Sequence, residues 1–278
     1  MRVICVVDNA AQRGSEFWAE HGVAFMIEKG DKRLLFDTGQ SGTVLLHNLE
    51  VLGIEPTTID ALVLSHAHND HASGLAKLLD HLRPGIPLYA HTDIFRQRYS
   101  KKGGEIHNKS FSIRRQSLEA QLHLQLNHQP EEIIPGIWTT GGIIERQERE
   151  GRSDDHLMQE GDDLVPDAYR DDMAMVLEIR DGLMLLCGCC HAGLLNTLAH
   201  IERNFDSPVL YIAGGLHLTG VNADYLEHVS DVLASKSTLK GVYPSHCSGE
   251  AAFVVFSNLL GSSVVHPCPA GTILDLGV

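Results

Sequence analysis

The chain has 278 residues, of which 43% are hydrophobic and 21% are charged, a composition typical of a globular enzyme with a sizeable core. Its 22 basic and 36 acidic residues give a formal net charge of −14, which argues against nucleic acid or an anionic membrane as the partner. Residues 1–9 read as a strand rather than a signal peptide, and no apolar run has the length of a membrane helix. The six cysteines contain a single C-x-x-C spacing, at Cys187 and Cys190, and do not form the two C-x-x-C pairs of a four-cysteine zinc site. We therefore expect a cytoplasmic protein with free thiols and a small-molecule substrate.

Both halves of the chain repeat one order of elements. Alternation and helical spacing in the first half predict a strand at 1–9, a hairpin at 23–39, a helix at 40–53, a strand at 60–71, a helix at 73–82 and a strand at 86–91. The second half predicts a hairpin at 173–193, a helix at 194–204, a strand at 208–218, a helix at 222–235 and a strand at 239–249. Two such units, packed sheet against sheet, predict an α/β protein with four layers in the order αββα.

A polar segment from about residue 100 to 172 separates the halves within one domain of residues 1–278. Its charge predicts a solvated insertion, although a long segment in a compact domain also suits a lid over the site or an arm of a homodimer. Its arginines are candidates for binding a phosphate or carboxylate, or for a solvated surface: Arg114, Arg115, Arg146 and Arg152.

A cluster of metal-binding side chains ends the strand predicted at 60–71. His66, His68, Asp70 and His71 form the motif H-x-H-x-D-H after an apolar run. Ligands of open α/β sheets bind at the carboxyl ends of strands, and imidazoles with a carboxylate suit zinc, iron or manganese. The turn is therefore predicted to supply part of a metal site.

The remaining ligands are expected from the second half, where three strand ends each carry a histidine. They are His191 in "GCCHAG", His217 in "GGLHL" and His246 in "PSHCSG". His191 and His246 have small neighbours and are predicted to be ligands. His217 suits a ligand, a substrate-binding group or a general acid.

The successive motifs "LLFDTG", "SHAHNDHASGL" and "PSHCSG" resemble those of the metallo-β-lactamase superfamily. Within it, "CGCCHAGLLN" and "AGGLHLTG" are similar to the dihydropterin–ribofuranosylaminobenzene-phosphate synthase-like subgroup. The resemblance runs from Val6 to about Gly249 and is weakest between residues 100 and 172. It implies a four-layer αββα sandwich and an enzyme with one or two divalent metal ions, with zinc expected first and iron or manganese as alternatives.

The resemblance also implies roles for individual residues. One metal site would consist of His66, His68 and His246, and the second of Asp70, His71 and His191. Many members place a bridging aspartate in a Gly-Asp pair where this chain has Gly188–Cys189, so Cys189 is a candidate thiolate ligand or a packed core residue. Asp37 is expected to orient a ligand imidazole or a water, Asp70 to take up a proton, and His217 to protonate the leaving group.

Four functions fit these features. The first is a hydrolase that uses metal-activated hydroxide on an ester, lactone or phosphoester. The second is the pterin-transferring synthase chemistry of the subgroup. The others are a mononuclear iron dioxygenase and a non-catalytic metal-binding sensor, the sensor being suggested by the altered Gly188–Cys189 pair.

Overall fold

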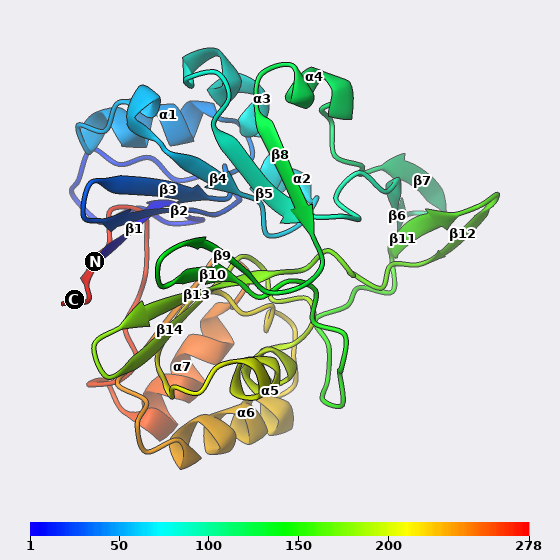
Figure 1. The fold of residues 1–278 in the computed structure, drawn as a ribbon. Helices are drawn as coiled ribbons and strands as arrows, with labels where there is room; N and C mark the ends of the chain where they lie inside the picture. The colour runs from blue at the N-terminus through cyan, green and yellow to red at the C-terminus, as the bar shows by residue number, and fades with distance from the viewer. Residues whose placement is uncertain (278) are drawn as a thin grey trace.

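Two β-sheets pack face to face in the computed structural model, which describes residues 1–277 (Figure 1). The strands of the first sheet are β1 (Arg2–Val7), β2 (Ala24–Lys29), β3 (Lys32–Phe36), β4 (Ala61–Val63), β5 (Pro87–His91), β8 (His123–Asn127) and β17 (Ile273–Asp275). They lie in the order β17-β1-β2-β3-β4-β5-β8. The strand β17 thus returns to the edge of the first sheet beside β1, and the backbone N–H of Leu276 donates to the carbonyl of Met1 at 2.9 Å (Figure 1).

The second sheet has the order β16-β15-β14-β13-β10-β9. Its strands are β9 (Glu131–Ile134), β10 (Ile137–Thr139), β13 (Ala174–Ile179), β14 (Gly182–Cys187), β15 (Val209–Gly215) and β16 (Gly241–Ser245). The four strands β13 to β16 repeat the pairing of β2 to β5, because in both sets an antiparallel pair is followed by two parallel pairs. The predicted two-fold repetition is therefore confirmed in the strand topology.

Helices cover the outer faces of both sheets, which confirms the four-layer αββα arrangement (Figure 1). The helices are α1 (Thr43–Val51), α2 (Asn69–Ala72), α3 (Leu75–Leu78), α4 (Arg115–Glu119), α5 (Leu194–Asn204), α6 (Ala223–Ser235) and α7 (Glu250–Leu260), with 3₁₀ turns at Pro56–Thr58 and Leu79–His81. The helix expected at 73–82 is thus shorter than predicted and tightens into a 3₁₀ turn. Of the helices within residues 1–277, none is both long enough and apolar enough to cross a membrane.

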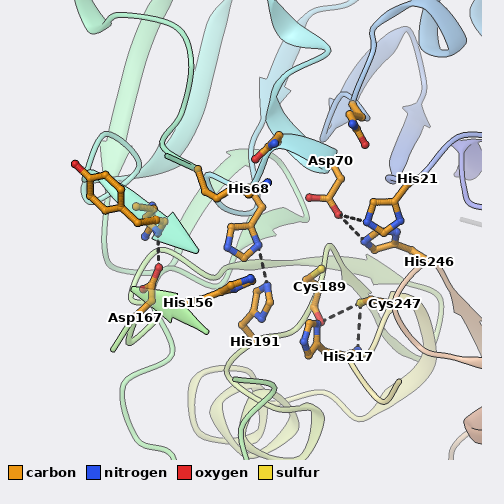
Figure 2. A pocket seen from close by; sticks show the side chains of 15 residues that line it. His21, His68, Asp70, His156, Asp167, Cys189, His191, His217, His246 and Cys247 are labelled. Carbon is orange, nitrogen blue, oxygen red and sulfur yellow. Dashed lines mark hydrogen bonds and ion pairs between the residues drawn. The ribbon is translucent and has the colours of Figure 1, made fainter. Parts of the chain in front are cut away.

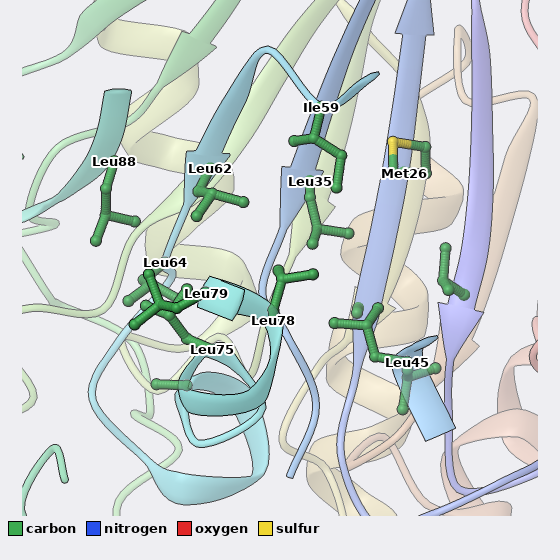
Figure 3. Close-up of a cluster of buried hydrophobic side chains, with 14 of the residues drawn as sticks. Met26, Leu35, Leu45, Ile59, Leu62, Leu64, Leu75, Leu78, Leu79 and Leu88 are labelled. Carbon is green, nitrogen blue, oxygen red and sulfur yellow. The ribbon is translucent and has the colours of Figure 1, made fainter. Parts of the chain in front are cut away.

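The strands are apolar on both faces because each sheet is buried on both sides. On β1, Val3 and Cys5 face the core between the sheets, whereas Ile4 and Val6 face the helices. Figure 3 shows the helix side of the first sheet, where Leu35 and Leu62 pack against Leu78. Burial of such side chains contributes about 1.5–3 kcal/mol each, before the cost of conformational entropy.

The segment expected as one insertion at about 100–172 is divided in the structure. Its central part supplies β8, β9 and β10 to the two main sheets. Its flanks form a separate four-stranded sheet that projects to one side: β6 (Arg98–Lys102), β7 (Glu105–Asn108), β11 (His156–Glu160) and β12 (Asp163–Pro166) (Figure 1). The small-sheet strands and the main-sheet strands alternate along the chain, so the segment is not one continuous addition.

Candidate metal centre

The histidine motif occupies the turn between β4 and α2. His66 and His68 follow the end of β4, and the single turn of α2 carries Asp70 and His71. Because β3 and β4 are parallel neighbours, Asp37 after β3 emerges at the same edge of the sheet as this turn. His66 and His71 are almost fully buried, and His68 and Asp70 line a pocket of about 340 Å³.

The second half presents its own strand ends to the same pocket. Cys189 and His191 follow β14, His217 follows β15 and His246 follows β16. All four line the pocket together with His68 and Asp70 of the first half (Figure 2). The repeated topology therefore brings the predicted metal-site residues of both halves together around one pocket. The four candidate arginines do not line it.

A first donor group consists of His66, Cys189 and His191, whose ligand atoms all lie within 4.8 Å of one another. His191 Nε2 also lies 3.3 Å from His68 Nδ1. Burial lowers the pKa of all three imidazoles well below the ordinary histidine value, so each ring is neutral at pH 7 and keeps a lone pair. His66 Nε2 is buried with no hydrogen-bond partner among the described residues, as expected of an atom that awaits a metal ion.

A second donor group consists of His71, Cys189 and His246, again within 4.8 Å. The Nε2 atoms of His71 and His246 lie 3.2 Å apart, and Asp70 Oδ2 lies 3.3 Å from His246 Nε2. Burial disfavours a charge on His71, but Asp70 and Asp37 outweigh burial and raise its pKa to about 9. The two carboxylates therefore favour positive charge at this second group.

The grouping implied by the sequence resemblance is wrong for two histidines. His246 was expected with His66 and His68, and His191 with Asp70 and His71. In the structure, His191 lies with His66 and His68. His246 lies with Asp70 and His71. The cause lies in the edge strand β16: the backbone N–H of His246 donates to Asp8 Oδ1 at 2.7 Å, in the loop after β1. This bond fixes His246 on the Asp70 side of the pocket.

Cys189 belongs to both donor groups and to a third with His217 and Cys247. Its Sγ lies 3.1 Å from His71 Nε2. Burial raises the pKa of the Cys247 thiol, but Cys189 and His217 outweigh burial and lower it well below the ordinary cysteine value. The pair Gly188–Cys189 thus places a sulfur atom between the two sets of histidines.

Hydrogen bonds to the protein fix the orientation of the imidazoles. His71 Nδ1 donates to Asp37 Oδ2 at 2.7 Å, and His191 Nδ1 donates to the carbonyl of Gly151 at 2.7 Å. Both bonds use Nδ1 and thereby direct the Nε2 atom of each ring toward its donor group. Asp37 is fully buried with a φ of 60°, a left-handed conformation that is uncommon for aspartate.

Replacing Asp37 with asparagine is expected to weaken metal binding at the second donor group by about 10–100-fold. Asp37 accepts three hydrogen bonds, from His71 Nδ1 and from the backbone N–H and hydroxyl of Ser65. If the asparagine oxygen keeps the Ser65 N–H, its amide donates to His71 Nδ1 and moves the imidazole proton to Nε2. Competition with a chelator measures the affinity. Asp181→Asn, an exposed residue that also has positive φ, is the matched control, and equal affinities for both variants would refute this role.

Buried ion pairs connect the small sheet to the histidine turn. Asp171 Oδ2 accepts a hydrogen bond from the backbone of Ala67 at 2.9 Å, and its Oδ1 pairs with Arg98 Nη2 at 2.5 Å. Arg98, on β6, also pairs with Asp167 at 2.8 Å. The small sheet therefore supports the turn that carries His66 and His68, in addition to forming one wall of the pocket.

The pocket residues that the sequence patterns did not predict include two histidines and a cysteine. His21 Nε2 lies 3.2 Å from Asp70 Oδ2, and the His156 ring lies 5.1 Å from the His68 ring. The third is Cys247. Only Cys247, which directly follows a predicted ligand in "PSHCSG", could have been found from the sequence. His21 and His156 lie in a loop and in the small sheet, where no periodic pattern places them.

Comparisons with known proteins agree on one family. A family model described as the metallo-beta-lactamase superfamily matches residues 18–156. A Methanocaldococcus jannaschii protein named 7,8-dihydropterin-6-methyl-4-(beta-D-ribofuranosyl)-aminobenzene-5'-phosphate synthase is 28% identical over 271 residues, covering 92% of this chain and 90% of the relative. An uncharacterized protein of the same organism is 30% identical over 257 residues, covering 91% and 93%. A solved structure described as a metal-dependent hydrolase of the beta-lactamase superfamily has a TM-score of 0.84 at 26% identity, over 100% of both chains.

Proposed function

The chain belongs to the metallo-beta-lactamase superfamily, and from that membership we propose that it is a metal-dependent hydrolase of a small ester, lactone or phosphoester. The family match and the named synthase relative make it an enzyme. One observation carries the proposal: strand ends from both halves converge on two donor groups that share Cys189, beside a pocket of about 340 Å³. A pocket of that volume suits a small molecule.

We propose that the first donor group, together with His68, holds one metal ion, and that the second group, together with Asp70, holds another. Cys189, whose sulfur belongs to both groups, would be a ligand available to either ion, at the position where many family members have a carboxylate. A set of imidazoles with a thiolate favours zinc, whereas iron and manganese are the alternatives that metal analysis must test. The unpartnered Nε2 of His66 and the neutral imidazoles support this assignment.

A bound divalent cation supplies a nucleophilic water at neutral pH and polarises a substrate oxygen. Asp70 is proposed to take up the proton of the nucleophile. Burial disfavours its charge, but His71 and His21 outweigh burial and hold its pKa well below the ordinary range, so the group is a carboxylate. The His217 ring lines the pocket, and its buried Nδ1 is without a hydrogen-bond partner in residues 1–277. We propose that this ring protonates the leaving group.

Synthase chemistry is the second candidate. The relative named as a dihydropterin–aminobenzene phosphate synthase matches 92% of this chain, which favours a pterin and an arylamine phosphate as reactants. In that case the pocket would hold two organic molecules, and His217 would assist the departure of a leaving group in the same way. Whichever reaction it catalyses, we also propose that the protein has a small-molecule partner and a cytoplasmic location. We propose further that it forms a homodimer and that the small sheet is a lid over the pocket.

A substrate panel on metal-reconstituted protein separates the two candidates. The panel contains phosphoesters, lactones, and a dihydropterin with a phosphate or diphosphate leaving group on its side-chain methylene, offered together with an arylamine phosphate. The same sample is analysed for metal content. We expect about two zinc ions per chain and hydrolysis of at least one ester class. Product formation only from the pterin and arylamine pair would favour the synthase. Metal-loaded protein inactive on every compound would contradict both.

A further inference from the structure

A second cavity of about 640 Å³ lies outside the metal pocket and shares no lining residue with it. It is formed by the segment after β5, by residues 143–152 and by residues 168–170. We propose that this cavity binds an organic anion whose charged group is a phosphate or a carboxylate. The inference does not depend on the reaction at the metal centre.

Positive charge gathers in this cavity although the chain as a whole is strongly acidic. Its lining includes four arginines and only two carboxylates: Arg96, Arg146, Arg152 and Arg170 against Asp93 and Glu150. Two positive charges are therefore in excess within a chain of net charge −14. Guanidinium groups match the geometry of phosphate and carboxylate oxygens in two-point contacts, which makes arginine the usual residue for such anions.

Two of the arginines form ion pairs through Nε alone, so their Nη atoms are available to a ligand. Arg96 pairs with Asp93 through Nε at 3.0 Å, and Arg152 pairs with Glu150 through Nε at 2.7 Å. No hydrogen bond or ion pair within residues 1–277 engages the Nη atoms of either side chain. The carboxylates thus orient the two guanidinium groups and leave their outer edges available to a ligand. Arg146 is different, because its side chain is 8% exposed and donates to the backbone carbonyls of Ala168 and Tyr169.

His91 adds a neutral donor to the cavity wall. Its Nδ1 accepts the backbone N–H of Asp93 at 3.0 Å, so the ring proton must lie on Nε2. Burial lowers the pKa of His91 to about 4, which keeps the ring neutral at pH 7. The side chain is 6% exposed, and its Nε2–H has no acceptor in the described part of the chain. His91 lines the cavity, so this donor is available to a ligand there.

An exposed apolar side chain indicates that the ligand also has an organic part. Ile144 lines the cavity and is 78% exposed, the highest value for any large hydrophobic residue of the described chain. A bare inorganic ion would leave this side chain in water. The cavity volume falls within the range of about 300–1,000 Å³ that is usual for small organic ligands.

Calorimetric titration of the metal-loaded protein with phenylphosphonate tests the proposal, because this probe combines a phosphate-like group with an apolar ring and cannot be hydrolysed as an ester. The double variant Arg96→Gln/Arg152→Gln is expected to bind at least about 10-fold more weakly, since it removes the charge-assisted hydrogen bonds that both guanidinium groups would donate to the anion. The matched control Arg115→Gln, an exposed arginine on α4, should bind like the unaltered protein. Unchanged binding by the double variant would overturn the proposal.

Further arms identify the ligand group and exclude other sites. Comparing the affinities for benzoate and phenylphosphonate shows whether the cavity prefers a carboxylate or a phosphate-like group. Ile144→Ser should reduce the difference in affinity between phenylphosphonate and inorganic phosphate. In His66→Ala the binding should persist, because the cavity is separate from the metal centre. Binding that disappears in His66→Ala but survives in the double variant places the probe at the metals and rejects the inference. A double variant that changes only the oligomeric mass would instead identify an interface and also reject it.

Discussion

Replacing His66 with alanine is expected to remove one metal ion per chain and to lower metal-dependent activity by more than about 100-fold. The reason is that loss of an outer-shell partner alone costs about 10–100-fold in metal affinity or activity, and His66 is proposed to bind the metal directly. Metal analysis after dialysis and initial rates on the best substrate of the panel measure the two effects. His123→Ala, an exposed histidine on β8, is the control for loss of an imidazole elsewhere.

The corrected grouping makes this prediction specific. His66 and His191 lie in the first donor group and His246 in the second. His66→Ala and His191→Ala should therefore lose the same ion, whereas combining His66→Ala with His246→Ala should remove both. If the single variants at 66 and 246 lost the same ion, the grouping implied by the sequence would be restored. Urea unfolding of the metal-free proteins must accompany the test, because His66 is buried and its truncation leaves a cavity.

The sheets and the donor residues were predictable because their patterns are local. Strands such as "RVICVV" and "GLMLLC" are apolar at nearly every position, because both faces of each sheet are buried. The histidines directly follow the predicted strands, and neighbouring parallel strands end at the same edge of a sheet. The sequence repeat further indicated that the two sheets are related by a two-fold arrangement, which places the histidine-bearing edges of both sheets around one pocket.

The pairing of donors could not be predicted, because it depends on how one sheet is placed against the other. Whether His191 or His246 lies beside Asp70 is decided by the contact between β16 and the loop after β1, where Asp8 binds the backbone of His246 across 238 positions of sequence. Likewise, β8, β9 and β10 have only five, four and three residues and lie within the segment predicted as an insertion, yet they complete the main sheets. Helix α7 lies outside every predicted element, although its apolar residues Ala252 and Phe256 are fully buried.

Cys189→Ala is expected to weaken binding of both metal ions together, unlike any single histidine variant. Its Sγ is the one donor atom that belongs to both proposed groups, so its loss removes a ligand from each. Cobalt-substituted protein gives a direct readout, since a bound thiolate produces a charge-transfer band that should disappear in the variant. Cys190→Ala is the matched control, because that neighbouring thiol packs in the helix-side core and contacts Thr197 instead of the pocket.

Cys189→Asp then separates a ligand role from a packing role. An aspartate can bridge two cations as a thiolate can, so this variant should again hold two ions. Its preference should move from zinc toward manganese, because a carboxylate is a harder ligand than a thiolate. A purely packed cysteine predicts the opposite order: alanine would then be tolerated, and a buried aspartate would destabilise the fold at a cost of several kcal/mol. Full metal content in Cys189→Ala together with unfolding of Cys189→Asp would therefore assign the sulfur to the core and leave the imidazoles to bind metal without it.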